Sequence, residues 1–150
     1  MEYFTDFMAH ALTEAQAAMQ ADEVPVGAVI VSPTGQIISS AQNRMRRDND
    51  ATAHAEMLAI KKAMEKLGCS RLDGYDLWVT LEPCAMCAGA IGHARLRRLY
   101  FAAYDTKSGA VEHGPCLFQH ATIHHHPEII GGIQQHEAAA LLKTFFEQKR

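Results

Sequence analysis

Hydrophobic residues recur at steps of three and four residues in several parts of this chain. Such spacing places them on one face of a helix, which can then pack against a core. The second of these stripes stops at Gly68, a residue type that commonly ends helices. A stretch rich in alanine and glycine after Pro83 predicts a further helix, one that can approach a sheet closely. The predicted helices are residues 4–20, 54–67, 84–94 and 138–146.

Other segments are richer in β-branched and aromatic residues, as is typical of strands. The predicted strands are residues 24–31, 36–42, 77–81 and 96–104. The turn Ser32-Pro33-Thr34-Gly35 separates the first two, so we expect them to pair as a hairpin. Residues 77–81 form a nearly continuous apolar run, which indicates a strand buried on both faces. Residues 111–133 show no clean period, and we expect one short strand among them.

The alternation of strands with helices predicts βαβ units with right-handed crossovers. We therefore expect an α/β fold of three layers, in which helices flank both faces of a central mixed sheet of about five strands. A chain of 150 residues is most simply one domain, here residues 1–150, and is long enough to bury a substantial core.

Composition narrows the cellular setting. No run of the sequence reaches the roughly 18 apolar residues that a membrane span needs. The acidic amino terminus lacks the layout of a signal peptide, so we expect a cytoplasmic protein with reduced thiols. The four cysteines then indicate metal ligands, a redox pair or core residues before disulfides.

The formal net charge of −3 argues against a protein that coats nucleic acid, but it leaves room for a local basic face. Arg44, Arg46 and Arg47 form one basic stretch, for which a solvated surface loop is the simple interpretation.

Two short motifs carry the chemistry. His54-Ala55-Glu56 and Pro83-Cys84-Ala85-Met86-Cys87 together offer one imidazole, two thiolates and one carboxylate, each motif at the start of a predicted helix. Three metal ligands plus a spare acid/base favour an open, catalytic zinc site, because structural zinc sites close with four protein ligands. Zn²⁺ would bring the pKa of a bound water to about 7, and Glu56 is placed to carry its proton to a leaving amine.

Three other interpretations compete. Cys84 and Cys87 could be a thiol–disulfide pair, although this leaves His54 and Glu56 without a role. Cys69 or Cys116 could complete a closed structural zinc centre. His54 could also be a buried histidine held by hydrogen bonds, but a following glutamate and a downstream P-C-x-x-C motif make the metal-site interpretation more specific.

The two motifs match the H-x-E and P-C-x-x-C signature of zinc nucleobase deaminases. The segments Glu23–Val29, Thr52–Glu56, Thr80–Ala90 and Asp105–Ala110 also closely resemble the bacterial tRNA-specific adenosine deaminases. The similarity extends from about residue 4 to 148, far beyond the metal signature alone.

This resemblance implies a cytidine-deaminase-like fold and a homodimer that converts adenosine to inosine at the wobble position of a tRNA anticodon loop, with an arginine tRNA as the substrate. It implies that His54, Cys84 and Cys87 hold one Zn²⁺ per subunit, that Glu56 moves the proton, and that Asn43 contacts the flipped adenine. Six further residues match positions near the RNA: Arg44, Asp105, Lys107, His120, Phe145 and Phe146.

The sequence departs from the family pattern in two places. Ala51 stands where a proline is usual, and His124-His125 stand where Asn-His is common. The second departure leaves open what residues 111–133 contribute. Three alternatives to a tRNA deaminase remain: deamination of a free base or nucleoside such as guanine or cytosine, a zinc-stabilised binding module without turnover, and a redox protein.

Overall fold

A single mixed sheet forms the centre of the protein. The structure is a computed structural model, which describes residues 6–149. The strands are β1 (Gly27–Val31), β2 (Ile37–Gln42), β3 (Asp76–Leu81), β4 (Arg98–Ala103) and β5 (Glu128–Gly131). They lie in the order β2-β1-β3-β4-β5. Strand β1 is antiparallel to both β2 and β3, whereas β3, β4 and β5 run parallel. The predicted mixed sheet is confirmed, and β5 is the short strand expected within residues 111–133.

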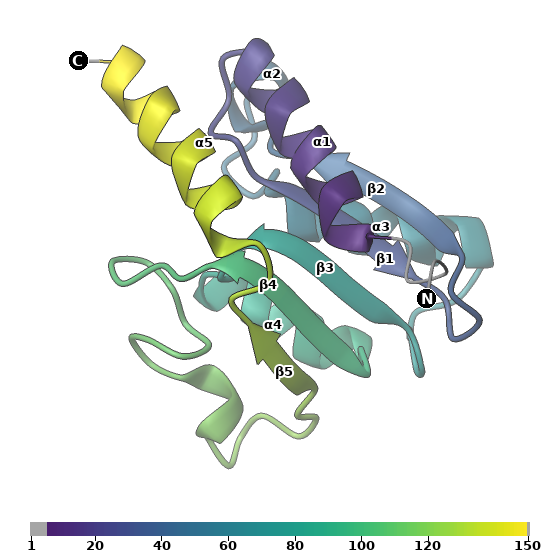
Figure 1. The fold of residues 1–150 in the computed structure, drawn as a ribbon. Helices are drawn as coiled ribbons and strands as arrows, with labels where there is room; N and C mark the ends of the chain where they lie inside the picture. The colour runs from purple at the N-terminus through teal and green to yellow at the C-terminus, as the bar shows by residue number, and fades with distance from the viewer. Residues whose placement is uncertain (1–5, 150) are drawn as a thin grey trace.

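Helices cover both faces of the sheet, which confirms the predicted three layers (Figure 1). The helices are α1 (Phe7–Gln20), α2 (Met45–Asp48), α3 (Ala55–Leu67), α4 (Ala85–Ala94) and α5 (Gln135–Gln148), with a 3₁₀ turn at Leu117–Gln119. Helices α1 and α5 pack on one face, and α3 and α4 on the other. No helix within residues 6–149 is long and apolar enough to cross a bilayer.

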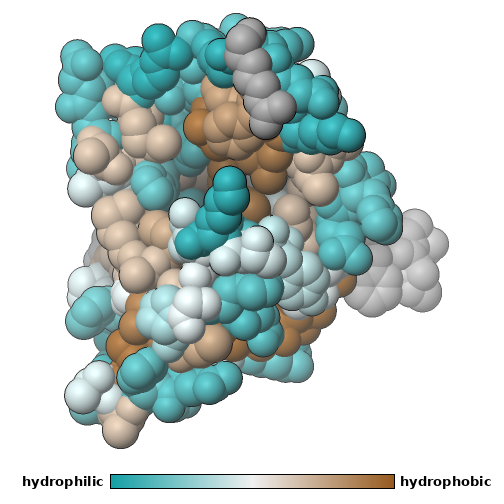
Figure 2. All heavy atoms as spheres, turned by 90° about the vertical axis from the view of Figure 1, so that its left-hand side faces the viewer, coloured by the Kyte–Doolittle hydropathy of each residue, from teal (hydrophilic) through white to brown (hydrophobic). Residues whose placement is uncertain are grey.

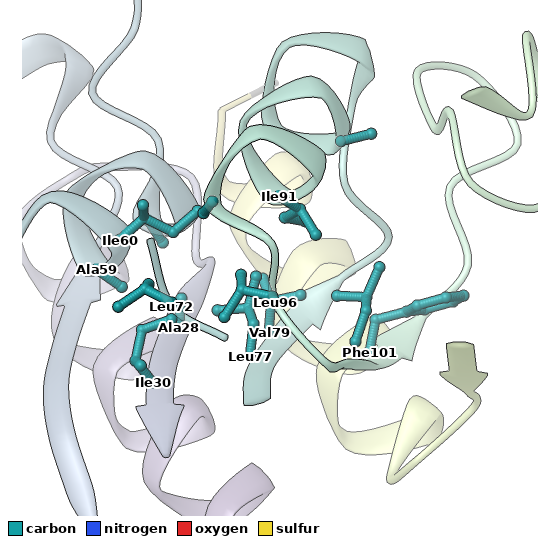
Figure 3. Close-up of a cluster of buried hydrophobic side chains, with 14 of the residues drawn as sticks. Ala28, Ile30, Ala59, Ile60, Leu72, Leu77, Val79, Ile91, Leu96 and Phe101 are labelled. Carbon is teal, nitrogen blue, oxygen red and sulfur yellow. The ribbon is translucent and has the colours of Figure 1, made fainter. Parts of the chain in front are cut away.

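The central strands bury side chains on both faces. Leu77 and Val79 of β3 point into the cluster beneath α3 and α4, where Ile91 also lies (Figure 3). Trp78, between them in sequence, packs with the α1 and α5 layer. Because successive side chains of a strand alternate between faces, a strand covered on both sides must be apolar throughout. This explains the continuous apolar run of residues 77–81.

Several element boundaries differ from those predicted. Strand β1 begins at Gly27, where a Cβ would lie 2.0 Å from the Ala11 carbonyl oxygen, so glycine lets the strand pass close under α1. Helix α1 begins at Phe7 behind Asp6, whose carboxylate accepts a hydrogen bond from the N–H of Ala9. The predicted start at Phe4 lies outside the described residues.

The basic stretch is not a plain solvated loop. Met45–Asp48 forms the short helix α2, and each arginine has an acidic partner. Arg44 pairs with Asp48. Arg46 and Arg47 pair with Asp22 and Glu23 respectively, at the end of α1. The sequence pattern missed this because the partners of Arg46 and Arg47 are more than twenty positions away.

Candidate active site and metal centre

Two helix starts bring the predicted metal ligands together. His54 immediately precedes α3 and Cys84 immediately precedes α4, while Cys87 lies in the first turn of α4. The two helices pack against each other on the same face of the sheet. The Nδ1 atom of His54 lies 3.7 Å from the Cys84 sulfur and 3.5 Å from the Cys87 sulfur. All three candidate ligand atoms lie within 4.8 Å of one another.

This donor set fits zinc. With Zn–S near 2.3 Å and Zn–N near 2.0–2.1 Å, tetrahedral coordination separates a nitrogen from a sulfur ligand by about 3.6 Å. The observed separations bracket that value. Contacts with Cys87 and His54 lower the pKa of the Cys84 thiol to about 3, so it is readily a thiolate. The contact with Cys84, followed by burial, raises the pKa of the Cys87 thiol.

The fourth-ligand alternative is not supported. Within residues 6–149 the metal-ligand cluster contains only His54, Cys84 and Cys87. Cys69 is exposed, and its thiol contacts the Arg71 carbonyl oxygen. The thiol of Cys116 contacts the carbonyl oxygen of His113. The site therefore has the three-ligand composition of a catalytic centre rather than that of a closed structural one.

Glu56 lies beside this cluster, in the first turn of α3, with only 4% of its surface exposed. Burial raises the pKa of its carboxyl to about 7, against smaller opposing contributions from its own backbone N–H and from His54. A carboxyl near neutrality can both accept and donate a proton under physiological conditions, which is what a proton shuttle requires.

Asn43 connects the end of β2 to the start of the ligand helix. It is 4% exposed, and its Oδ1 accepts a hydrogen bond of 2.8 Å from the N–H of Ala55. The guanidinium of Arg47 donates to the Asn43 carbonyl oxygen. The side-chain oxygen of Asn43 is thus occupied by a hydrogen bond within the protein, which leaves the side-chain NH₂ of Asn43 as the group that can bind a ligand.

A small pocket of about 160 Å³ lies over the cluster. His54, Cys84 and Glu56 line it, as does Asn43. A larger groove of about 760 Å³ adjoins the pocket, and Asp105 and Ser108 are among the residues that line both. Figure 2 views this side of the molecule and shows a recess with hydrophobic side chains inside and hydrophilic ones around it. The metal centre is thus reached through an open groove.

The structure brings some of the predicted RNA-contact residues to the groove and places others elsewhere. Asp105, Lys107 and Phe146 line it. Phe145 is 6% exposed and packs beside Phe146, with their ring centroids 5.3 Å apart.

Like Phe145, the other two predicted RNA-contact residues, Arg44 and His120, do not line the pocket or the groove. Arg44 adjoins Asn43 but is paired with Asp48. His120 follows the 3₁₀ turn, and its Nε2 lies 2.7 Å from the Pro115 carbonyl oxygen.

Sequence reasoning missed four residues that shape this site. Tyr104 and Lys149 line the groove from opposite sides, on the loop after β4 and beyond α5. Glu23 and Glu82 are buried residues, 1% and 2% exposed, whose carboxylates accept hydrogen bonds from backbone N–H groups of α2 and of the loop after β4 respectively. Glu23 and Glu82 could have been found in the sequence because each adjoins a strongly apolar segment. Burying a carboxylate there costs free energy unless hydrogen bonds compensate it.

Residues 1–103 match the family model of the cytidine and deoxycytidylate deaminase zinc-binding region. The chain belongs to this deaminase family. The matched region contains His54, Glu56, Cys84 and Cys87. Zinc is therefore the cofactor expected at the three-ligand cluster, and the identification of the chain as a deaminase from its motifs is confirmed.

Within the deaminase family, the chain is similar to proteins that act on tRNA. It is 52% identical over 146 residues to the tRNA-specific adenosine deaminase of Agrobacterium fabrum, covering 97% of this chain and 95% of that one. A structure from work on A-to-I editing by tRNA:A34 deaminases superposes with a TM-score of 0.90 and 52% identity, covering 92% of this chain and 99% of that one. The guanine deaminase of Nitrosomonas europaea is more distant, with a TM-score of 0.80 and 26% identity over 92% of this chain and 81% of that one.

Proposed function

We propose that this deaminase hydrolyses adenosine to inosine at the wobble position of a tRNA anticodon loop. The observation that carries the proposal is the small buried pocket at the metal cluster that opens into a much larger groove. A pocket for one base suffices for a free-base deaminase, whereas a groove beside it suits the rest of a polymer. Three relatives that are 52%, 46% and 40% identical are named tRNA-specific adenosine deaminases, and these names support the same substrate.

The reaction consumes water and releases ammonia. When bound, Zn²⁺ lowers the pKa of a water molecule toward about 7 and so makes a nucleophile available at neutral pH. Glu56 would accept a proton from the attacking water, whose oxygen bonds to C6 of adenine, and would pass a proton to the exocyclic amine, which leaves as ammonia when the C6–N bond breaks. His54, Cys84 and Cys87 would hold the metal, and the Asn43 amide would donate to the ring of the extruded base.

The groove suits a single-stranded loop. Phe146 and Tyr104 are 48% and 44% exposed, and both line it. Exposed aromatic rings can stack on unpaired bases, and Lys107 and Lys149 can contact phosphates. We extend the proposal to Arg44, His120 and Phe145 as residues near the bound RNA, a role that rests on the family resemblance alone.

Three finer points of the proposal also rest on resemblance. They are an arginine tRNA as substrate, a homodimer as the working form and the cytoplasm as the location. Relatives named for action on tRNA support only the third of these points, because tRNA modification is typical of the cytoplasm.

The test compares RNA with free nucleosides. Zinc-loaded protein is incubated with an anticodon stem-loop that carries a wobble adenosine and, in parallel, with free adenosine, cytidine and guanine. Glu56→Ala serves as the blank. Inosine only in the RNA is the expected result. Turnover of a free base with none in RNA would assign the protein instead to the free-base deaminases, the class represented by the guanine deaminase neighbour.

A further inference from the structure

The carboxylate of Glu82 is fully buried, and within residues 6–149 its partners are backbone N–H groups and the His113 imidazole rather than a lysine or an arginine. Its side chain is 0% exposed and accepts hydrogen bonds from the loop that follows β4. Oε1 accepts from the N–H of Asp105 at 3.0 Å and lies 2.8 Å from His113 Nδ1. Oε2 accepts from the N–H groups of Val111, Glu112 and His113 at 3.2, 2.8 and 3.1 Å. A carboxylate that accepts this many hydrogen bonds is a strong organising centre.

The donors lie at the two ends of one loop. Asp105 is at its start and residues 111–113 are at its close, so the single carboxylate ties both ends together. The middle of the loop also packs onto Glu82, since a Cβ on Gly109 would lie 2.6 Å from the Glu82 carboxyl carbon and 2.4 Å from the Asp105 carbonyl oxygen. The loop can close this tightly only because position 109 has no side chain.

The same loop is one wall of the groove. Asp105, Thr106, Lys107 and Ser108 line it, opposite α5. Leu142 and Phe146 of α5, together with Lys149, line the same groove. The Asp105 carboxylate accepts from the N–H groups of Lys107 and Ser108 at 3.1 and 2.9 Å, so the position of Asp105 sets that of its neighbours. The anchor at Glu82 thereby fixes the groove wall.

We propose that Glu82 is a positioning residue for the RNA: it holds the loop of residues 105–113 in the shape that the anticodon loop binds, without taking part in the chemical step. The inference deepens the proposed function and rests on it. A preformed loop lowers the cost of ordering that binding would otherwise incur. Loss of the anchor should therefore weaken substrate binding while the metal ligands and Glu56 continue to work.

The test substitution is Glu82→Gln. It keeps the shape of the side chain but replaces one carboxylate oxygen, an acceptor, with an NH₂ donor that faces other N–H groups. The matched control is Asp76→Asn, a buried carboxylate at the other end of β3 that pairs with Arg97 at 2.9 Å, far from the groove lining. We expect Glu82→Gln to raise the KM for the stem-loop roughly tenfold and to leave kcat within about twofold, the pattern of lost binding rather than lost chemistry. Asp76→Asn should leave both constants unchanged.

An unchanged KM in Glu82→Gln overturns the proposal. So does an equal rise in Asp76→Asn, which would indicate general destabilisation, or a loss of zinc from Glu82→Gln, which would place the effect at the neighbouring ligand Cys84. Zinc content is therefore measured in every variant.

A milder pair keeps the test usable if Glu82→Gln fails to fold. His113 is one-third exposed, and His113→Ala removes its side-chain hydrogen bond to Glu82 and its edge contact with Tyr104 but keeps its backbone N–H bond to Glu82. His113→Asn can place an amide N–H where Nδ1 lies. We expect roughly a threefold rise in KM for His113→Ala and recovery for His113→Asn. No rise in the alanine variant, or no recovery in the asparagine variant, contradicts the proposal.

Hydrogen exchange separates this inference from the proposed function. If the wild-type protein makes no inosine in the stem-loop, the proposed function fails, and the KM assay fails with it. The amides of Asp105 and residues 111–113 should still lose protection in Glu82→Gln and keep it in Asp76→Asn. Unchanged protection in Glu82→Gln shows that the carboxylate does not organise the loop and overturns the inference on its own.

Discussion

The side-chain oxygen of Asn43 accepts a hydrogen bond of 2.8 Å from the N–H of Ala55, the first residue of α3. His54 lies immediately before that N–H and Glu56 immediately after it. One amide thus fixes the start of the helix that carries a metal ligand and the proton shuttle, and the same amide lines the pocket for the base. Asn43 thus helps to build the site, and under the proposed function it would also contact the substrate base.

Two substitutions at Asn43 separate these roles. Asn43→Ala loses the acceptor for the Ala55 N–H, which should lower the free energy of unfolding by about 1–2 kcal/mol and also reduce turnover. Asn43→Asp keeps an acceptor at the helix start, where negative charge is favourable, but removes the amide donor. It should therefore retain more stability than Asn43→Ala while still losing turnover. Denaturant unfolding and inosine assays on both variants check this, and equal stability of the two contradicts the capping role.

The metal ligand and the proton shuttle should fail in different ways. His54→Ala should lose zinc and stability together, because metal-binding energy is partly folding energy. Glu56→Ala should keep zinc and fold while turnover is lost. The control is His93→Ala on α4, an exposed histidine outside the ligand cluster, which should change neither property. Metal content, melting temperature and inosine formation are measured together, and full zinc occupancy in His54→Ala contradicts the ligand assignment.

Glu23 should make stability depend on acid pH. Burial raises the pKa of its carboxyl, but hydrogen bonds from the N–H groups of Arg47 and Arg46 and from the Arg47 guanidinium outweigh burial and hold it below the ordinary value of 4.5. The ionised form therefore stabilises the fold above the unfolded-state pKa, and this contribution is lost as pH falls through the lower folded-state value.

Glu23→Gln should thus lower the free energy of unfolding near neutral pH by about 1–3 kcal/mol. It should also flatten the decline of stability with acidification below pH 4.5, the ordinary carboxyl value. Urea unfolding at several pH values checks both effects. The exposed Glu65→Gln on α3 is the control and should reproduce the wild-type profile. A Glu23→Gln profile that is parallel to wild type would show that the carboxylate gains no net stabilisation from its donors.

Adjacent phenylalanines should have opposite phenotypes. Phe146, 48% exposed in the groove, should lose RNA affinity on change to alanine, by about 1–3 kcal/mol if one base stacks on it, with little loss of stability. Phe145, 6% exposed, should instead lose stability, by about 3 kcal/mol. Fluorescence anisotropy of a labelled stem-loop and thermal unfolding distinguish the two. Weaker binding in Phe145→Ala alone would contradict the assignment of the groove.

Local patterns predicted the helices and strands well because the spacing of apolar residues within a segment reflects which of its faces are buried. The stop at Gly68 appears in the structure as a left-handed residue that ends α3, as its sequence position indicated. The apolar run of residues 77–81 predicted a central strand, and in the structure the two faces of this strand pack against two different hydrophobic clusters. The boundaries were less well predicted: β1 begins at Gly27 because the strand passes close under α1, and α5 begins at Gln135 rather than at Ala138.

The sequence by itself determined the donor set: one imidazole, two thiols and a spare carboxylate in two short motifs, because ligand chemistry is a property of residue types. Only the tertiary structure decided what surrounds them. Arg46 and Arg47 pair with acidic residues at the end of α1, and the carboxylate of Glu82 accepts hydrogen bonds from the loop that follows β4. These contacts join residues more than twenty positions apart, so no local period or motif encodes them, and they exist only once the sheet has brought the helix starts and loops to one edge.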